Sequence, residues 1–374
     1  MIFKRVTLGS DMIKVAHVSI RHTPFDTRIF HKECKTLSKN GYNVSFIVPH
    51  SKDEKVEKIN IVSLKKADSK FYKVFKNIPA ALSKCFKINS EVYHFHDPEL
   101  IPIGLILKIK GKKVIYDAHE DHPRDVFEKL WPMPLKIIAY VYFSILEKLA
   151  SIFFDRVVAA TPHIALKYPN KKKILLRNFP ILELIDKSNK IEIKSDNLIL
   201  IYQGGITKLR GVKQVIDSLG IIDEKIELLL FGKWESGFEE ECKKIKGWKK
   251  TKHLGVVRQE ELYGYGKSAD IGIINYLSSP NNDDSLPNKP FEYMACGLPI
   301  IMSDFSHWKE MFKECALFCN PENPKEIAKN IRILAEDPIL REKMGKNGRA
   351  LVEKEYNWEK ESIKLIDMYR GMFN

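Results

Sequence analysis

The sequence lacks a segment that would carry the chain across a membrane. No apolar run reaches the roughly 18 uncharged residues that a spanning helix needs. The nearest approach, residues 131–154, is interrupted by Lys136, Glu147 and Lys148. We interpret this segment as a buried helix, with a membrane-surface helix as the alternative. The N-terminus lacks the apolar stretch of a signal peptide, and we expect residues 1–11 to be an extension or an alternative start.

Cysteine is sparse, and its spacing does not form a metal-binding pattern. The six cysteines lie at positions 34, 85, 242, 296, 315 and 319, without a CxxC pair. Cys315 and Cys319 are four residues apart, but no matching His or Cys pair completes a zinc site. The sequence therefore favours reduced thiols in a cytosolic protein and predicts no metal site.

Positive charge is concentrated in the first half of the chain. Residues 1–180 hold 32 Lys and Arg against 17 Asp and Glu, a net charge of +15. Residues 181–374 hold 30 against 31, a net charge of −1. Such an excess attracts nucleic acid, anionic lipid or phosphorylated substrates. Because no aromatic-interleaved basic motif or helix-turn-helix pattern is present, we expect no nucleic-acid partner.

Short apolar runs alternate with helix-patterned stretches, such as a predicted helix over 26–41 that stops at Gly41. In the first half, strands are predicted at residues 13–20, 43–49, 91–97, 112–119 and 155–161. In the second half, strands are predicted at residues 197–205, 226–232, 251–257, 269–276, 298–304 and 315–320. This alternation predicts an α/β protein with two doubly wound, Rossmann-like domains. We expect the domains at residues 1–180 and 181–354, followed by a closing helix at residues 355–374.

The segment LIYQGGITKLRGVKQVI, residues 200–216, places glycines and a cation after a predicted strand. Open α/β sheets bind ligands beyond the carboxyl ends of their strands. Gly204 and Gly205 let backbone N–H groups approach a ligand, and Arg210 precedes a predicted helix N-terminus. These are groups that bind a pyrophosphate. The alternative is a plain strand-ending turn, since a glycine pair alone is a weak signal.

The segment NKPFEYMACGLPII, residues 288–301, contains one carboxylate among apolar and turn-forming residues. Pro290 and Gly297 predict a short helix that begins and ends here, with Glu292 in its first turn. A carboxylate is favourable there through the helix dipole, so a structural role is one interpretation. The other is that Glu292 accepts two hydrogen bonds from vicinal hydroxyls, as on a ribose. Lys289 offers a positive charge to a phosphate.

Together these segments resemble the nucleotide-binding domain of the retaining, family-4-type (group 1) glycosyltransferases with the GT-B fold. The stretch NKPFEYMACGLPIIMSD is similar to that family's donor-binding signature, in which a Glu at the helix start binds the nucleotide ribose. A second Glu of the motif, which contacts the donor sugar, is replaced here by Asp284. The family's phosphate loop contains Gly-Arg and, further on, Lys-Gly. In this chain Gly205 stands in place of the Arg, and Arg210 stands in place of the Lys. The resemblance implies that the donor is bound by Gly204, Gly205, Arg210, Asp284, Lys289 and Glu292.

Two segments of the first half, residues 21–48 and 93–121, resemble one branch of the same enzymes. The resemblance spans Met12 to Met311 and implies two domains facing one another across a cleft, with the C-terminal helix crossing back to the first. His119 ends a predicted strand. In the family an equivalent histidine contacts the donor sugar or helps to position the reaction, which implies a catalytic role for His119.

Other polar residues of the first half are weaker candidates. Asp26, Arg28 and Asp97 lie in loops after predicted strands, and we assign them tentatively to the acceptor side. Asp26 is also a good helix cap, and Asp97, which precedes a proline, is a good turn residue. His22, His94 and His96 have weaker claims, because neighbouring strand histidines more often pack or pair internally.

The resemblance implies transfer of a sugar from a nucleotide-diphosphate donor to a hydroxyl, with retention of configuration. Negative charge develops on the leaving nucleoside diphosphate, and cations and oriented N–H groups stabilise it. We therefore expect Arg210 and Lys289 to act in catalysis alongside His119. No strand-ending Asp-x-Asp is present, so we expect neither a metal nor a cofactor beyond the donor substrate. No protein nucleophile is assigned.

The acceptor should be a saccharide or a lipid-linked diphosphate bound by the basic first domain. The resemblance then implies bacterial surface polysaccharide or lipopolysaccharide assembly, by a cytoplasmic protein in peripheral contact with an anionic membrane at its inner face. Two alternatives stay open. One is a GT-B nucleotide-sugar epimerase or hydrolase, and the other is a two-domain sugar-binding protein without catalysis.

Overall fold

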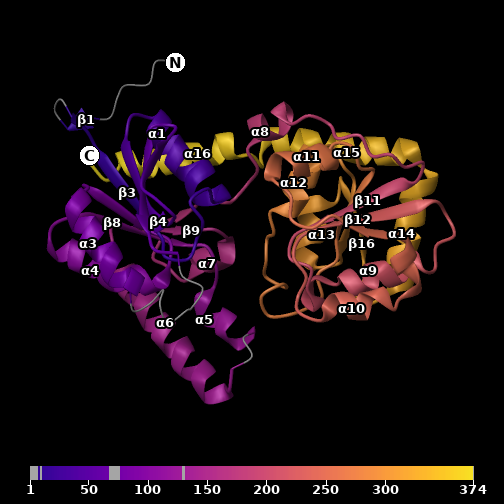
Figure 1. The fold of residues 1–374 in the computed structure, drawn as a ribbon, viewed down its shortest axis with the longest axis horizontal. Helices are drawn as coiled ribbons and strands as arrows, with labels where there is room; N and C mark the ends of the chain where they lie inside the picture. The colour runs from indigo at the N-terminus through magenta and orange to yellow at the C-terminus, as the bar shows by residue number, and fades with distance from the viewer. Residues whose placement is uncertain (1–6, 9–10, 67–75, 129–130, 374) are drawn as a thin grey trace. The chain divides into compact units, whose positions relative to one another are not determined.

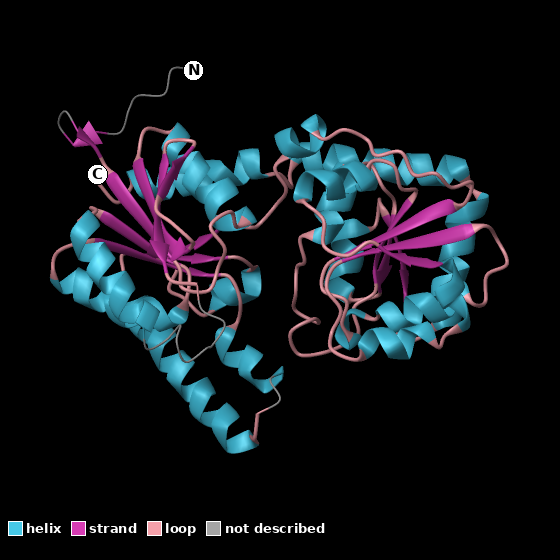
Figure 2. Ribbon diagram, in the orientation of Figure 1, coloured by secondary structure: helices cyan, strands magenta, loops and turns pink. Residues whose placement is uncertain are grey.

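The structure is a computed structural model that describes residues 7–8, 11–66, 76–128 and 131–373, so the predicted extension at residues 1–11 lies largely outside it. Its contacts divide the chain into unit 1, Met1–Asn178 with Lys360–Asn374, and unit 2, Phe179–Glu359. Helix α16 (Trp358–Arg370) begins in unit 2 and continues in unit 1. Each unit is a largely parallel sheet flanked by helices (Figures 1 and 2), which confirms the predicted α/β class with two Rossmann-like domains.

Unit 1 is built on an eight-stranded sheet with the order β10-β9-β8-β7-β3-β4-β6-β5. Neighbouring strands are parallel except for β5 and β6. Its central strands are apolar and buried, as expected for a parallel sheet covered on both faces. The bounds are β3 Lys14–Val18, β4 Asn43–Pro49, β5 Glu54–Val56, β6 Ile59–Leu64, β7 Val92–Phe95, β8 Lys113–Ala118, β9 Arg156–Ala159 and β10 Lys173–Leu175. A separate antiparallel pair is formed by β1 Thr7–Leu8 and β2 Asp11–Met12.

The helices of unit 1 include a cluster on one face of the sheet, where α3, α4, α6 and α7 bury apolar side chains. The helix predicted over 26–41 is a π-helical segment η1 (Thr27–Cys34) continued by α1 (Lys35–Lys39), and Gly41 follows it. The remaining bounds are α3 Ile78–Ile88, η3 Pro98–Leu100, α4 Ile101–Ile109, α5 His122–Asp125, η4 Val126–Glu128, α6 Met133–Phe153 and α7 Pro162–Leu166.

Unit 2 is built on a six-stranded, wholly parallel sheet with the order β13-β12-β11-β14-β15-β16. Two buried clusters lie on its opposite faces: Leu200 and Tyr202 of β11 belong to one, Ile199 and Ile201 to the other. The strand predicted at 251–257 is shorter than expected, because β13 already ends at His253. The bounds are β11 Leu198–Gln203, β12 Ile226–Phe231, β13 Thr251–His253, β14 Ile271–Ile274, β15 Ile300–Ser303 and β16 Ala316–Cys319.

The helices of unit 2 connect these strands in the α/β manner that the sequence predicts. Helix α14 is the second longest of them in the described chain and packs against α9 and β16. Their bounds are α8 Leu182–Lys187, η5 Lys208–Arg210, α9 Val212–Leu219, α10 Phe238–Lys243, η6 Lys246–Lys250, α11 Gln259–Gly266, α12 Lys289–Ala295, α13 Ser306–Phe312, α14 Pro324–Glu336 and α15 Pro338–Lys354.

Candidate functional site

Each sheet has one point at which the strand order reverses. In unit 2 this point lies between β11 and β14, and in unit 1 it lies between β3 and β7. Open α/β sheets bind ligands beyond the carboxyl ends of the strands at such a point. The side chains and loops that follow these four strands are therefore the first places to look for a site.

Glu292 lies in the first turn of α12, as predicted, and is only 7% exposed. Its Oε2 accepts hydrogen bonds from Gln203 Nε2 at 2.7 Å and from Lys289 Nζ at 3.0 Å. Among the described residues, no hydrogen bond ends on its Oε1. The carboxylate is thus held by one oxygen, and the other keeps its capacity to accept hydrogen bonds.

Tyr293 explains why α12 presents Glu292 at the end of β11. Its hydroxyl accepts a hydrogen bond from the backbone N–H of Gln203 at 3.0 Å and donates to the carbonyl of Ile201 at 3.1 Å. The ring is buried, with 1% exposure. This pair of backbone contacts fixes the first turns of the short helix against the last residues of the strand.

The turn after β11 depends on glycine at two positions. Gly204 has a φ of +135°, which glycine adopts without steric cost. Gly211 has a φ of +63°, and a Cβ there would lie 1.9 Å from the carbonyl oxygen of Asn275. The Tyr202 hydroxyl donates to the Gly205 carbonyl at 2.7 Å and fixes the turn between them. The start of α9 can therefore lie against the end of β14.

Arg210 ends the η5 turn and stacks on an aromatic ring. Its Cζ lies 3.8 Å from the centroid of Tyr276, which is 6% exposed. The backbone N–H of Leu277 donates to the Leu209 carbonyl at 2.9 Å, so this turn is tied to the segment that follows β14. Burial raises the pKa of the Tyr276 hydroxyl, while the charges of Arg210 and Lys289 lower it. Both predicted cations therefore act on the same buried ring.

The arrangement brings most of the predicted donor-binding groups together at the end of β11 and β14. Helix α9 begins at Gly211 without a side-chain cap, and a helix N-terminus of this kind binds anions. Arg210 and Lys289 add positive charge, and Glu292 adds an acceptor for hydroxyl groups. Asp284 lies exposed in the loop before α12, so its contact with a sugar stays a prediction.

Two residues of this site were not predicted from the sequence. Gln203, the last residue of β11, donates a hydrogen bond to Glu292. Tyr276, just past β14, provides the ring against which the Arg210 guanidinium packs. Only their position in the sequence could have indicated them, because residues at the carboxyl ends of parallel strands lie on the side of the sheet where ligands bind. Neither residue type is distinctive enough to be singled out without the partner that it contacts.

The reversal point of unit 1 is occupied by buried histidines. His17 of β3 and His94 of β7 are register partners, and His96 follows β7 directly. His17 Nδ1 lies 2.9 Å from His96 Nε2, and His94 Nδ1 lies 2.9 Å from the Tyr369 hydroxyl of α16. The expectation that the strand histidines pair internally is therefore confirmed for His94 and His96.

Arg28 is 5% exposed and lies inside this network. It donates to both carboxylate oxygens of Asp117, at 3.1 and 2.9 Å, and to the carbonyl of Leu176 at 3.0 Å. Burial disfavours the charged form of Asp117, but the charge of Arg28 outweighs it and holds the pKa of Asp117 well below its usual range. The guanidinium is thus fully engaged within unit 1.

Asp26 and Asp97 also have defined structural partners. Asp26 Oδ1 caps η1 by accepting the backbone N–H groups of Arg28 and Ile29, both at 2.9 Å. Asp97, 1% exposed, accepts from Ser19 Oγ at 2.8 Å and from the backbone N–H of Ile20 at 2.7 Å. The two carboxylates shape the segments around β3. Their acceptor-side roles, like that of Arg28, stay predictions.

His119 lies one residue beyond β8 and retains partial access to solvent, with 13% of its side chain exposed. Its Nε2 is 3.0 Å from His96 Nδ1, and its Nδ1 is 3.8 Å from Asp117 Oδ1. Burial lowers the pKa of His119 well below the usual value, so the imidazole is neutral near pH 7. A neutral ring of this kind can exchange hydrogen bonds with a sugar hydroxyl. The catalytic role stays a prediction.

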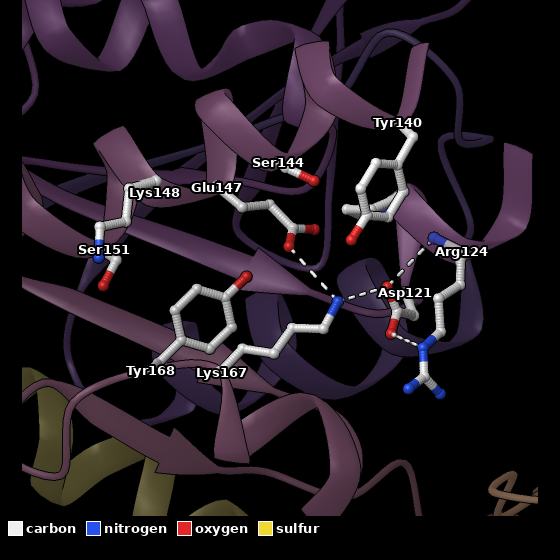
Figure 3. A pocket seen from close by; sticks show the side chains of 10 residues that line it. Asp121, Arg124, Tyr140, Ser144, Glu147, Lys148, Ser151, Lys167 and Tyr168 are labelled. Atoms are coloured by element: carbon white, nitrogen blue, oxygen red, sulfur yellow. Dashed lines mark hydrogen bonds and ion pairs between the residues drawn. The ribbon is translucent and has the colours of Figure 1, made fainter. Parts of the chain in front are cut away.

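Unit 1 also contains a polar cavity of about 340 Å³ beside α6 (Figure 3). Lys167 forms an ion pair with Asp121, and its Nζ lies 3.6 Å from Glu147 Oε2. Burial raises the pKa of Glu147 to about 7, although the nearby Lys167 lowers it. The sequence did not single out these residues.

Comparison with known proteins finds a family match within the second unit. Residues 185–351 match the family model "Glycosyl transferases group 1". The chain is 27% identical over 335 residues to "Uncharacterized glycosyltransferase MJ1069" of Methanocaldococcus jannaschii, covering 82% of this chain and 79% of the relative. It is also 27% identical over 199 residues to "Capsular polysaccharide biosynthesis glycosyltransferase CapM" of Staphylococcus aureus, covering 49% of this chain and 50% of CapM.

Solved structures match over nearly the whole chain. Sucrose-phosphate synthase of Thermosynechococcus elongatus has a TM-score of 0.79 at 18% identity, covering 96% of this chain and 99% of the other. HepE of Anabaena, in complex with UDP-glucose, has a TM-score of 0.73 at 11% identity, covering 96% and 100%. These similarities establish the fold of both units as that of GT-B glycosyltransferases. The residues of unit 2 that the sequence predicts to bind the donor all lie within the family match.

Proposed function

Because residues 185–351 match the family model of the glycosyl transferases group 1, we propose that this chain transfers a sugar from a nucleotide-diphosphate sugar to a hydroxyl acceptor with retention of configuration. The observation that carries this proposal is the setting of Glu292. One carboxylate oxygen is fixed by Gln203 and Lys289 at the strand reversal point, and the other is not used. A pair of vicinal ribose hydroxyls fits such a carboxylate.

The diphosphate of the donor would lie against the start of α9 and Arg210. As the glycosidic bond breaks, negative charge grows on the leaving diphosphate, and the N–H groups, Arg210 and Lys289 stabilise it without reorganisation. Lys289 would exchange its contact with Glu292 for one with a phosphate when the ribose arrives. These protein cations supply the role that a metal plays elsewhere, so the reaction proceeds without a metal and without a cofactor besides the donor.

Two known structures support a nucleotide-sugar donor. HepE was solved with UDP-glucose, and a trehalose-6-phosphate protein of E. coli, with a TM-score of 0.72, was solved with UDP-2-fluoro glucose. For the acceptor, the relative CapM is named for capsular polysaccharide biosynthesis. We therefore assign this chain to the assembly of a bacterial surface polysaccharide or lipopolysaccharide, at the inner face of the cell membrane.

The donor assignment can be tested by thermal shift against a panel of nucleoside diphosphates and nucleotide sugars. A nucleotide that binds at 100 times its Kd stabilises the folded chain by about 2.7 kcal/mol. Glu292→Gln should abolish most of that shift and reduce turnover strongly while leaving the unliganded melting temperature nearly unchanged. Glu342→Gln, an exposed control in unit 2, should behave as the wild type. Wild-type affinity in Glu292→Gln would refute the ribose contact.

The same panel separates transfer from the epimerase or hydrolase alternative. Product release from the nucleotide sugar should require an added saccharide or lipid-linked acceptor. Full-rate donor turnover without any acceptor would instead assign the chain to the alternative reaction.

We place the membrane contact on α6. None of the helices in the described residues is long and apolar enough to cross a bilayer. Helix α6 nevertheless exposes much of its apolar surface, and Figure 2 shows it extending from the sheet of unit 1. The exposed residues, each 48–64% accessible, include Met133, Leu135, Ile137, Ile138, Val141, Ile145, Ile152 and Phe153. An apolar helix on a unit with excess Lys and Arg fits the surface of an anionic bilayer.

Flotation with vesicles of anionic phospholipid tests this surface. The double variant Ile138→Glu/Ile145→Glu should float much less than the wild type, because it places two charges on the apolar face. Ile339→Glu, at an 81% exposed position of unit 2, is the matched control and should float normally. A wild-type chain that stays unbound at low salt would overturn the membrane assignment.

A further inference from the structure

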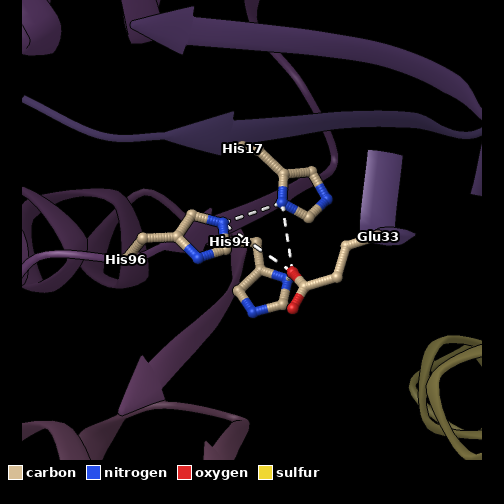
Figure 4. Close-up of side chains that lie close together, drawn as sticks. All are labelled: His17, Glu33, His94 and His96. Carbon is tan, nitrogen blue, oxygen red and sulfur yellow. Dashed lines mark hydrogen bonds and ion pairs between the residues drawn. The ribbon is translucent and has the colours of Figure 1, made fainter. Parts of the chain in front are cut away.

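Four buried side chains of unit 1 converge on one point with donor atoms facing one another (Figure 4). They are His17, His94, His96 and Glu33, and each is 0% exposed. They come from β3, from β7 and the residue after it, and from η1. The fold thus brings together three imidazoles and one carboxylate that are up to 79 residues apart in the sequence.

The spacing of their donor atoms suits a small four-coordinate cation. From Glu33 Oε2, the distances are 3.7 Å to His17 Nδ1, 3.9 Å to His96 Nε2 and 4.0 Å to His94 Nδ1. His17 Nδ1 and His96 Nε2 are 2.9 Å apart. Tetrahedral Zn²⁺ with bonds of about 2.0–2.1 Å places its ligand atoms roughly 3.3 Å apart. The four observed distances lie on both sides of this value, and all the donor atoms lie within 4.8 Å of one another, so side-chain shifts of up to about 1 Å would close the site.

A second carboxylate stands behind two of these imidazoles. Asp117 Oδ2 lies 3.5 Å from His96 Nδ1 and 3.9 Å from His94 Nε2, the ring nitrogens that face away from the point of convergence. Histidines that bind metals characteristically direct their other ring nitrogen toward a carboxylate, which fixes ring orientation and tautomer. Arg28 in turn holds Asp117 with two hydrogen bonds.

Glu33 forms an ion pair with Arg28 but lacks hydrogen bonds to its two carboxylate oxygens in the described residues. Its Oε1 lies 3.1 Å from Arg28 Nε, but that N–H is directed at Asp117. Within the described residues, neither Glu33 oxygen accepts a hydrogen bond. A buried carboxylate is stable only when it is paired, coordinates a metal or takes up a proton.

We propose that His17, His94, His96 and Glu33 bind a structural divalent transition-metal ion inside unit 1. Imidazole and carboxylate donors in this number suit Zn²⁺. All four ligands are closed off from solvent, so the ion stabilises the fold and does not touch a substrate. The Tyr369 hydroxyl, now 2.9 Å from His94 Nδ1, would move off that nitrogen when the ion binds. This site goes beyond the proposed transfer reaction and does not depend on it.

Metal analysis of the purified full-length chain tests the site. After dialysis against a chelator, and after refolding with equimolar Zn²⁺, the wild type should retain about one zinc per chain. His96→Gln and Glu33→Gln should each reduce this to background. His253→Gln, which removes a histidine of β13 in unit 2, should retain it. The refolded wild type should also melt at a higher temperature with Zn²⁺ than without it.

A spectroscopic measurement keeps the proposal testable when a ligand variant does not fold. Wild-type chain refolded with Co²⁺ should show the intense visible bands of a tetrahedral nitrogen–oxygen site, and Zn²⁺ added during refolding should suppress them. Zinc at background level in the refolded wild type, together with the absence of these bands, would overturn the proposal. The four side chains would then be a hydrogen-bonded network with a protonated Glu33.

Discussion

The two units share the order of six strands, to which unit 1 adds β5 and β10. Both place polar side chains at the same topological point, but they use those side chains differently. In unit 2, Glu292 and Arg210 are held by Gln203 and by the ring of Tyr276, and each keeps capacity for a ligand. In unit 1, Arg28 and Asp117 are buried and paired with one another. The charged groups at one reversal point therefore keep capacity to bind, whereas Arg28 and Asp117 at the other are paired with one another.

This difference shows that topology locates a polar cluster without defining its role. A parallel sheet directs polar residues to its carboxyl edge in both units. The deciding factors are burial and partners: a charge with all its hydrogen bonds satisfied internally stabilises the fold, and one with unused capacity can bind. Substitutions in the buried network of unit 1 should therefore mainly lower the free energy of unfolding. Substitutions in the unit 2 site should mainly lower the activity.

Arg28→Met should have the largest effect on stability. It leaves Asp117 and Glu33 as uncompensated buried carboxylates, and breaking a buried pair by removing one partner costs about 3–5 kcal/mol. Urea unfolding followed by circular dichroism measures this loss. Lys187→Met removes an exposed lysine paired with Glu183 and should cost less than about 1 kcal/mol. Equal losses in the two variants would contradict the distinction between a closed and an open network.

Arg210→Ala should show the reverse signature. If Arg210 stabilises the charge on the leaving diphosphate, its removal reduces kcat/KM by the equivalent of about 2–4 kcal/mol, while the melting temperature changes little. Steady-state kinetics with the donor found by thermal shift measures the effect. Lys208→Ala, two residues away in the same turn and paired with Glu241, serves as the control. A large loss of stability in Arg210→Ala would place it with Arg28 as a structural cation.

Much of unit 2 could be predicted from the sequence because its site uses residues with strong local signals. Glycines after a strand, an arginine before a helix, and a glutamate in the first turn of a short helix each have a local physical reason. The fold class followed from the alternation of strands and helices. Gln203 and Tyr276 were missed because their roles exist only through contacts with Glu292 and Arg210, which are distant in the sequence.

The buried network of histidines and carboxylates in unit 1 could not be predicted from the sequence either, because its contacts also join residues that are distant in the sequence. Glu33 lies within the predicted helix over 26–41 and was not singled out, yet it is 0% exposed and faces His17 and His94. Pairing of β3 with β7 brings these residues together, and strand register is not readable from one sequence. Asp26, by contrast, was predicted as a possible helix cap, and that local role is confirmed.

The two units can also be compared through one buried glutamate in each, Glu292 in unit 2 and Glu147 in unit 1, both of which lie near a lysine. Glu292 of unit 2 accepts hydrogen bonds from Gln203 and Lys289, whereas Glu147 of unit 1 has one oxygen without a hydrogen-bond partner in the described chain. Burial raises the pKa of Glu147 from 4.5 to about 7. The folded chain therefore holds this proton more tightly than the unfolded chain, and stability is lost as the pH rises from about 4.5 through about 7.

Glu147→Gln should remove this pH dependence, since the amide keeps the size of the side chain without a titrating proton. At pH 8 the variant should be more stable than the wild type by about 1–3 kcal/mol, and at pH 5 the two should be nearly equal. Melting temperatures across this range measure the difference, with Glu342→Gln as an exposed control that follows the wild type. A variant that runs parallel to the wild type from pH 5 to pH 8 would show that Glu147 is ionised throughout, so that Lys167 stabilises it as fully as Lys289 and Gln203 stabilise Glu292.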